Sequence, residues 1–287
     1  MKRILIIGVK GMAGHMIYNF FNEINSYDVY GLARNIRQND KLFNIDVSDL
    51  NLLSSILLDH QFDYIVNCIG ILNKDAEDNP SKAIWFNSYF PHYLEEVTKK
   101  NNTKIIHIST DCVFSGKRGA YTENDVKDGM GFYAQSKALG ELNNNKDITI
   151  RTSIIGPELN ENGIGLFHWF MSQPKESKLN GFRKAYWSGL TTLELSKVIV
   201  EVINQDITGL IQVAPKTKID KYNLIALFNA IYRDNKISIE PKDDYHIDKS
   251  LITIRTDFDY IVPNYQEMLL HQHEWILKHS DIYSRYL

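Results

Sequence analysis

The chain has 287 residues, of which 44% are hydrophobic and 23% charged, so it can bury a large core without a disulfide or metal. A net charge of −3 and the absence of a basic stripe argue against a nucleic-acid-binding surface. Two cysteines fit a reducing compartment, and no apolar run approaches the roughly 18 residues of a membrane span, so we expect a soluble cytoplasmic protein without membrane partners.

A strand, a glycine-rich turn and a helix are predicted at the start of the chain. Residues 3–8, RILIIG, are an aliphatic run typical of a buried strand. Gly8, Gly11 and Gly14 follow at a spacing of three, and apolar residues recurring near every fourth position predict a helix from Met12. Glycines there allow a tight turn and a close approach to a dinucleotide pyrophosphate at the helix N-terminus. We favour nucleotide binding over the alternative, a glycine turn without a ligand.

Strands and helices then alternate along the first half of the chain. The expected strands cover residues 27–34, 62–70, 103–110 and 147–156, and the expected helices cover 48–60, 80–100 and 131–144. This order predicts an α/β fold with a doubly wound parallel sheet of the Rossmann type. Ligands of such sheets bind at the carboxyl ends of the strands. The segments Gly8–Gly14, Cys68–Ile71 and Ser109–Phe114 should therefore gather at one edge.

Arg34 lies about twenty residues beyond the glycines, where an acidic residue usually binds the ribose 2′-hydroxyl. An arginine can pair with a 2′-phosphate, which favours NADPH as cofactor and keeps NADH as the alternative. A solvated loop residue is the competing interpretation of Arg34. Asp46 is a candidate acceptor for the adenine amine, and a helix-capping or surface aspartate is its alternative.

Tyr133 and Lys137 are one helical turn apart, downstream of the strand that ends in Thr110. Reducing a ketone by hydride transfer creates an alkoxide, to which a tyrosine hydroxyl can donate a proton. We expect the Lys137 ammonium to lower the pKa of Tyr133, because one charge at about 4 Å supplies roughly 4 kcal/mol at an effective dielectric near 20. Thr110 would bind the carbonyl oxygen. The alternative is a tyrosine packed on the sheet and a lysine in solvent.

The glycine turn, the strand-end hydroxyl and the downstream Tyr-x-x-x-Lys, in this order, resemble the extended short-chain dehydrogenases/reductases. Within that superfamily the chain is similar to the dTDP-4-dehydrorhamnose reductase family. The similar segments are STDCVFSG at 109–116, YAQSKALGE at 133–141, RTS at 151–153 and the closing VPNYQEMLLHQHEWI at 262–276.

The resemblance implies a catalytic set and two groups of binding residues. The catalytic set is Thr110, Tyr133 and Lys137. The cofactor contacts that it implies are Gly11, Met12, Ala13, Asp46, Val47, Cys68, Ile69 and Gly70, to which Lys137, Tyr133, Gly8, Gly14 and Arg34 are added from the residues themselves. The expected substrate contacts are Thr110 and Asp111, together with Arg183 and Trp187, which offer a cation for a diphosphate and a ring for a base.

The departures from the family pattern lie on the substrate side. Cys112 stands where the family usually has a tyrosine, and Ile154 where a tryptophan often lines the sugar site. We therefore expect the same chemistry on a related nucleotide sugar. The candidate substrates are dTDP-4-dehydrorhamnose and a UDP-2-acetamido-4-keto-6-deoxyhexose. The reaction would then serve dTDP-rhamnose biosynthesis or the synthesis of another surface polysaccharide.

Two lobes are expected to interleave along the chain. Residues 1–155 would form the NAD(P)-binding domain, to which 186–214 return, and residues 156–185 and 215–287 would form a smaller substrate-binding lobe. No metal ligand set is apparent, and a homodimer is an option. One rival function is an epimerase or dehydratase with bound NAD. The other is a non-catalytic regulatory subunit, similar to the one that accompanies methionine adenosyltransferase.

Overall fold

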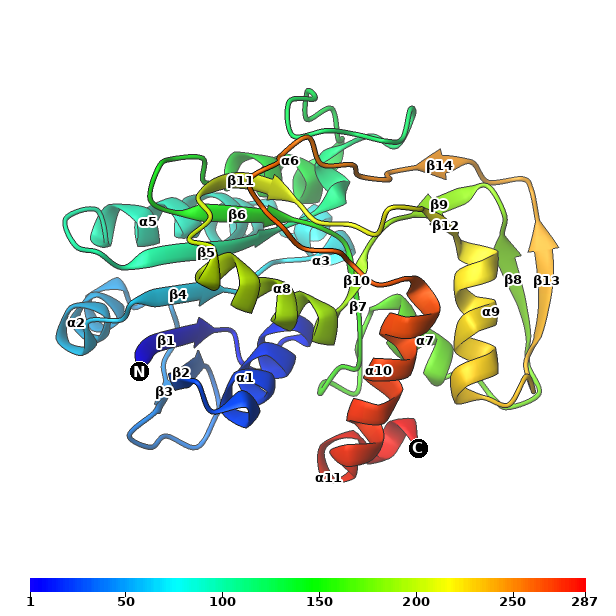
Figure 1. Ribbon diagram of the computed structural model, residues 1–287, viewed down its shortest axis with the longest axis horizontal. Coiled ribbons are helices and arrows are strands. Elements are labelled where there is room, and N and C mark those ends of the chain that lie inside the picture. Colours follow the sequence, from blue (N-terminus) through cyan, green and yellow to red (C-terminus); the bar gives the residue numbers. More distant parts are fainter.

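The computed structural model describes residues 1–287 and is built on one seven-stranded parallel sheet in the order β11-β6-β5-β4-β1-β2-β3 (Figure 1). The strands of this sheet are β1 (Lys2–Ile7), β2 (Tyr27–Ala33), β3 (Leu42–Asn44), β4 (Tyr64–Asn67), β5 (Lys104–Ser109), β6 (Ile148–Arg151) and β11 (Gly209–Gln212). The doubly wound Rossmann architecture predicted from the sequence is confirmed. Only the short edge strand β3 has no counterpart in the prediction, because three half-exposed residues are too few to show a period.

Helices cover both faces of the sheet because successive side chains of a strand point to opposite sides. In β1, Ile4 and Ile6 pack into the larger apolar cluster with α1 (Met12–Ile24) and α8 (Thr192–Asn204). Leu5 and Ile7 pack into the other cluster with α2 (Leu50–His60) and α5 (Phe90–Val97). All four side chains are fully buried, and each such burial contributes about 1.5–3 kcal/mol.

Side-chain caps define the starts of two of these helices. The Asp49 side chain accepts a hydrogen bond from the backbone N–H of Leu52 at the start of α2. The Thr191 hydroxyl accepts one from the backbone N–H of Glu194 at the start of α8. A cap of this kind stabilises a helix by about 1 kcal/mol.

The single helix predicted over residues 80–100 is a composite in the structure. It consists of α4 (Pro80–Ala83), the π-helical turn η1 (Ile84–Tyr89) and α5. Pro91 lacks an N–H and would crowd the carbonyl four residues earlier, and a widened turn accommodates it. The π-helical turn also carries the buried Asn87. The side-chain amide of Asn87 accepts from the Ile71 N–H at 2.7 Å and donates to the Ser136 hydroxyl at 3.0 Å.

The helix that carries the Tyr-x-x-x-Lys pair is α6 (Gly131–Leu139), shorter than the predicted 131–144. It ends at Gly140, where a Cβ would lie 1.8 Å from the carbonyl oxygen of Asn87. Only a glycine therefore allows the end of α6 to approach the backbone of the π-helical turn this closely. The other end of α6 is held by Glu77 of α3 (Asn73–Asp78), whose carboxylate accepts from the backbone N–H groups of Phe132 and Tyr133, each at 3.1 Å.

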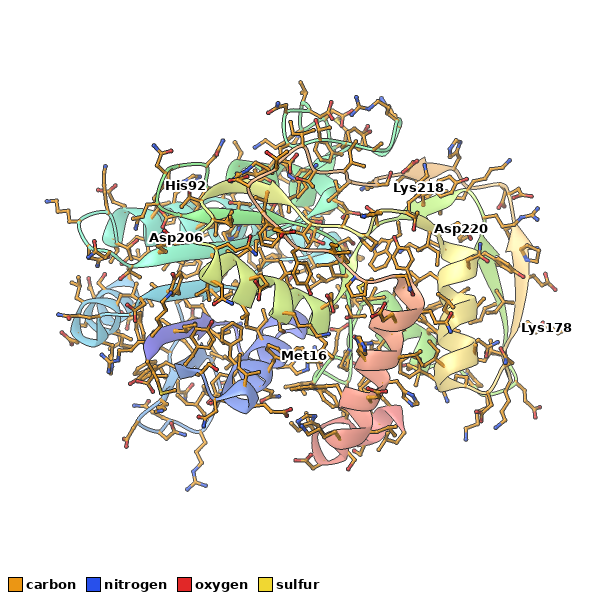
Figure 2. All side chains as sticks on the ribbon, in the orientation of Figure 1. Met16, His92, Lys178, Asp206, Lys218 and Asp220 are labelled. Carbon is orange, nitrogen blue, oxygen red and sulfur yellow. The ribbon has the colours of Figure 1, made fainter.

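A smaller group of elements lies beyond the carboxyl ends of the central strands, with α9, β8 and β13 at one end of the molecule (Figure 1). Its strands form three small sheets: β7 (Ile154–Ile155) with β10 (Leu190–Thr191), β12 (Ile219–Asp220) with β9 (Ala185–Trp187) and β14 (Ile247–Asp248), and β8 (Lys178–Phe182) with β13 (Ser238–Lys242). Its helices include α7 (Leu166–Met171), α9 (Lys221–Tyr232) and α10 (Tyr265–Lys278). Lys218 and Asp220 lie together at the start of α9 (Figure 2). None of the helices has the length and apolar character needed to cross a bilayer.

Candidate functional site

A cavity of about 930 Å³ opens at the carboxyl ends of β4 and β5, between the central sheet and the smaller lobe. It collects most of the side chains to which the sequence assigned a role. Those lining it are Gly11, Met12, Ala13, Cys68, Ile69, Gly70, Thr110, Asp111, Tyr133, Lys137 and Trp187. Cys112 and Ile154, at which this chain departs from the family pattern, line the cavity as well. Residues far apart in sequence thus form one site.

The glycine turn packs tightly and leaves the start of α1 without a side-chain cap. Gly8 has a φ of +95°, which favours glycine, and a Cβ on Gly14 would lie 2.1 Å from the Gly8 carbonyl oxygen. These two glycines lie behind the cavity wall and let α1 pack against the turn. Gly11 lies in the wall itself and precedes α1 without a side-chain cap, so the N–H groups of the first helical turn are left for an anion.

Arg34 and Asp46 lie outside the cavity and pair with each other, with 3.1 Å between the guanidinium Nη1 and carboxylate Oδ2 atoms. The arginine side chain keeps 65% of its surface exposed, so the pair is weak and can open. The other carboxylate oxygen of Asp46 accepts from the N–H and hydroxyl of Ser48. The neighbouring Val47 side chain is buried in the core, which leaves only its backbone for a ligand.

Lys221 is a cation that lines the cavity beside Trp187 and that sequence reasoning missed. Arg183, the predicted diphosphate contact, lies outside the cavity and forms an exposed ion pair with Asp243. Lys221 begins α9 and lines the cavity, with its ammonium 5.2 Å from the centre of the Trp187 ring. Burial lowers the pKa of Lys221 to about 8, against the opposing charge of Asp111. No local motif marks this lysine, because only the fold brings it to Trp187.

Thr110 and Tyr133 lie next to each other in the cavity wall. The Thr110 hydroxyl donates to the Asp111 carboxylate at 3.1 Å and accepts from the Cys112 N–H at 3.1 Å. Burial raises the pKa of Tyr133 well above its usual value, and a hydrogen bond with the Thr110 side chain opposes that rise only in part. The expectation that Lys137 lowers this pKa is wrong for this structure, because burial of the hydroxyl dominates the shift and the Lys137 ammonium is not among its causes. A tyrosine that keeps its proton is suited to act as an acid.

Lys137 lies in the cavity wall and is buried rather than solvated. Its side chain is 4% exposed, and its ammonium donates to the Ile108 carbonyl oxygen at 2.7 Å. Burial lowers the pKa of Lys137 to about 8, while the charge of Glu141 one turn later opposes the shift. The alternative of a lysine in solvent is therefore excluded.

A buried ion pair ties together the elements that present these residues. Arg151 donates two hydrogen bonds to the Glu141 carboxylate, at 2.9 and 2.7 Å, and both side chains are almost fully buried. Ser109 at the end of β5 donates to the same carboxylate at 2.7 Å. A third donor group of Arg151 reaches the Gln212 side chain on β11 at 3.0 Å. The pair thus fixes the segment that follows α6 against β5, β6 and β11.

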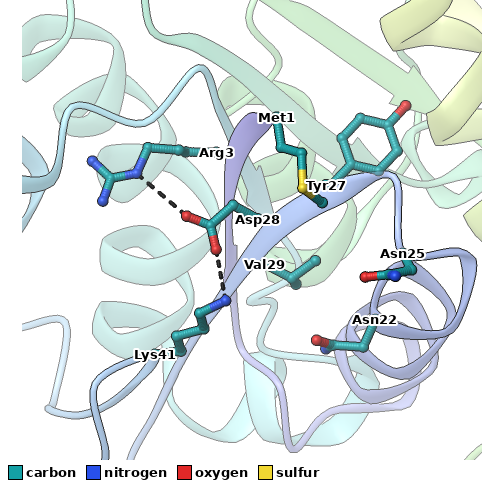
Figure 3. Close-up of a pocket in the computed structure, with 8 residues that line it drawn as sticks. All are labelled: Met1, Arg3, Asn22, Asn25, Tyr27, Asp28, Val29 and Lys41. Carbon is teal, nitrogen blue, oxygen red and sulfur yellow. Dashed lines mark ion pairs between the residues drawn. The ribbon is translucent and has the colours of Figure 1, made fainter.

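A second cavity, of about 460 Å³, lies at the opposite, amino-terminal end of β1 and β2 (Figure 3). Asp28 pairs there with Arg3 and Lys41, at 3.5 and 2.7 Å. The single carboxylate of this cavity is thus engaged by both of its cationic side chains, and none of the predicted site residues lines it. The cavity at the carboxyl ends is therefore the candidate site.

Comparison with known proteins gives one family and several relatives. Residues 1–212 match the family described as RmlD substrate binding domain. A dTDP-4-dehydrorhamnose reductase from Aggregatibacter actinomycetemcomitans is 31% identical over 53% of this chain and 51% of its own length. A methionine adenosyltransferase 2 subunit beta from Bos taurus is 29% identical over 49% of this chain and 42% of its own length. The alignments thus span about half the length of these curated relatives.

Among solved structures, a dTDP-4-dehydrorhamnose reductase from Bacillus anthracis, crystallised in complex with NADP, has the same fold. It is 20% identical, with a TM-score of 0.80 over 96% of this chain and 99% of the other. The resemblance found in the sequence is confirmed, since the family match covers well over half of the residues. The chain belongs to the RmlD substrate binding domain family, among the extended short-chain dehydrogenases/reductases.

Proposed function

We propose that this chain is an NADPH-dependent reductase of the 4-keto group of a nucleotide-linked 6-deoxy sugar. The observation that carries the proposal is the convergence of Thr110, Tyr133 and Lys137 in one cavity with the glycine turn at one side and Lys221 at the other. The named reductase relative and the NADP complex of the structural relative support it.

The chain's own residues divide the work of the reaction. A bound NADPH would supply the hydride. Thr110 holds the carbonyl oxygen with its hydroxyl, and Tyr133 donates its phenolic proton to the alkoxide that forms there. The raised pKa of Tyr133 keeps that proton in place at neutral pH. Lys137 is then the buried group from which the phenolate can recover a proton.

The sugar nucleotide would lie towards the smaller lobe. Lys221 and the Trp187 ring offer a cation for the diphosphate and an apolar surface beside it. Cys112 and Ile154 line the sugar side, where the family more often has larger aromatic side chains. A UDP-2-acetamido-4-keto-6-deoxyhexose carries a bulkier 2-substituent. It is as compatible with these smaller side chains as dTDP-4-dehydrorhamnose is. The product would serve surface polysaccharide synthesis.

Replacing Lys221 with methionine is expected to raise KM for the sugar nucleotide by about 10- to 100-fold with little change in kcat, because a charged hydrogen bond of about 1.5–3 kcal/mol is lost in both ground and transition states. Steady-state kinetics at saturating NADPH measure this. Arg183→Met is the matched control and should leave both KM and kcat unchanged, since Arg183 lies outside the cavity. Equal effects of the two substitutions would contradict the assignment.

Replacing Arg34 with alanine is expected to weaken NADPH binding by about tenfold and to leave NADH binding unchanged, because only NADPH carries the 2′-phosphate. Isothermal titration with each cofactor measures the two affinities. An equal loss for both cofactors would show that Arg34 acts on something other than the 2′-phosphate.

The test of the reaction is the oxidation of NADPH with freshly made dTDP- and UDP-linked 4-keto-6-deoxy sugars. Turnover of one of them would establish the reductase and identify its substrate. Tight cofactor binding without turnover of any sugar would overturn the proposal for those sugars. It would favour the second candidate, a regulatory subunit, which the similarity to the methionine adenosyltransferase subunit supports.

A further inference from the structure

A chain of three buried polar side chains lies beneath the cavity. Asn67 ends β4, His107 lies in the middle of β5, and Lys137 comes from α6. The Asn67 amide nitrogen is 3.2 Å from His107 Nδ1, and His107 Nε2 is 3.3 Å from the Lys137 Nζ atom. Asn67 and His107 are completely buried, so water cannot replace either contact.

The orientation of the Asn67 amide decides where the imidazole carries its proton. The backbone N–H of Ile69 donates to the Asn67 Oδ1 atom at 3.1 Å, which assigns the other end of the amide, an NH₂ donor, to His107. His107 Nδ1 must then accept, and in a neutral imidazole the single proton lies on Nε2. Burial keeps His107 neutral, since it lowers the pKa of this histidine well below its ordinary value. The Nε2–H group therefore points at Lys137.

An ammonium cannot accept this hydrogen bond, because it has three hydrogens and no lone pair. A neutral amine can accept from His107 Nε2–H and still donate to the Ile108 carbonyl oxygen. Every member of the chain is thus satisfied only when Lys137 is uncharged. With a charged Lys137, two donors face each other across a 3.3 Å contact with a fully buried imidazole, which is costly.

The other groups facing Lys137 act in the opposite direction or are neutral. Glu141, just beyond the end of α6, and Cys68, just beyond the end of β4, both favour the ammonium. Arg151 and Lys127 compensate the Glu141 charge through ion pairs. Tyr133, one turn before Lys137, is neutral because its pKa is raised.

We propose that Asn67 and His107 are positioning residues that fix the Nε2–H tautomer beneath Lys137 and thereby favour its neutral amine. The lowered pKa of Lys137 agrees with this arrangement. In the proposed reaction, a proton that moves from the Lys137 ammonium to the Tyr133 phenolate leaves a neutral amine, which His107 stabilises by donating to it. Solvent then restores the ammonium. The inference rests on the proposed function only for this last consequence.

Nuclear magnetic resonance of the full chain, saturated with NADP⁺ and also without it, tests the proposal independently of turnover. Histidine labelled with ¹⁵N reports the tautomer of His107, and lysine labelled with ¹³C at Cε reports the titration of Lys137, with Lys137→Met to assign its signal. We expect the Nε2–H tautomer in the wild type. Wild-type protein with the Nδ1–H tautomer would overturn the proposal whatever the variants do.

Two substitutions at Asn67 are expected to reverse the tautomer. In Asn67→Asp, the carboxylate can accept from both Ile69 N–H and imidazole Nδ1–H, so Nε2 becomes an acceptor for the ammonium and the pKa of Lys137 rises by about one unit or more. Asn67→Leu removes the donor without adding a charge and should raise the pKa in the same direction. A Lys137 pKa unchanged in the leucine variant, with the tautomer unchanged, would overturn the proposal.

Ser136→Ala is the matched control. Ser136 is buried on the same helix and accepts from the Asn87 amide, but it takes no part in the chain beneath Lys137. A purely structural role of Asn67 would make all three variants less stable and leave the Lys137 titration alike in each. Failure of the reductase assay with an intact tautomer pattern would instead remove the proposed function and keep the hydrogen-bonded chain.

Discussion

Replacing Arg151 with methionine is expected to lower the free energy of unfolding by about 3–5 kcal/mol, because it leaves the Glu141 carboxylate buried without its main counter-ion. The Gln212 side chain also loses the guanidinium that donates to it. Urea-induced unfolding followed by tryptophan fluorescence measures the change. Arg183→Met removes an exposed ion pair and serves as the control, for which we expect a change within about 0.5 kcal/mol.

The double variant Arg151→Met/Glu141→Leu should recover a large part of that loss, since removing both partners of a buried pair is often neutral. The cycle of two single variants and the double variant isolates their coupling. A cost below about 1 kcal/mol for Arg151→Met would show that Ser109 and Lys127 suffice to hold the Glu141 charge.

The same pair determines the response of stability to acid. Burial opposes the Glu141 charge, but the hydrogen bonds and charge of Arg151 outweigh it, so the pKa of this carboxyl is lowered. A lowered pKa in the folded state contributes stability above the unfolded pKa, and that stability is lost as pH falls through the folded value. Arg151→Met removes the contribution, so the variant and the wild type should converge in stability as the solution becomes acidic.

Replacing Tyr133 with phenylalanine is expected to lower kcat by about 10²–10⁴-fold, the usual contribution of a positioned acid, with a small change in KM for the sugar. The hydroxyl is removed while the ring that lines the cavity stays. Steady-state assays with NADPH and the accepted sugar measure the loss, and a separate cofactor titration shows how much of it comes from weaker NADPH binding. Wild-type turnover in this variant would remove Tyr133 from the catalytic set.

Tyr232→Phe is the matched control for the loss of a tyrosine hydroxyl. Tyr232 also stands four residues before a lysine, but it lies outside the cavity and donates to the Leu269 carbonyl oxygen at 2.8 Å. We expect a stability loss of about 1 kcal/mol and no change in kcat. The two variants thus compare a Tyr-x-x-x-Lys pair that lines the cavity with one that lies outside it.

Much of the sheet could be predicted because its signals are local. Aliphatic runs mark the buried strands, and the spacing of Gly8, Gly11 and Gly14 marks the turn before α1. Thr110, Tyr133 and Lys137 could be grouped because strand ends of a parallel sheet meet at one edge. That argument requires only the order of the elements along the chain.

The remaining features depend on burial and long-range packing, which spacing does not encode. Lys221 joins the cavity through α9, more than one hundred residues after Asp111, while the more conspicuous Arg183 lies outside it. The pKa of Tyr133 is raised because its hydroxyl is desolvated, and the amino-acid sequence alone gives no measure of desolvation. The π-helical turn follows from Pro91 together with contacts of Asn87 that only the fold creates.

The position of β11 in the chain has a consequence for synthesis on the ribosome. β11 pairs with β6 along Ile148–Arg151, yet it is translated more than fifty residues later, after β8 and β9. Until then the nascent chain carries β6 as a bare edge strand, open to pairing with other chains. The Arg151 guanidinium also lacks its contact with Gln212. A ribosome that stalls in this interval would therefore hold an aggregation-prone intermediate, even though every predicted catalytic residue has already been made.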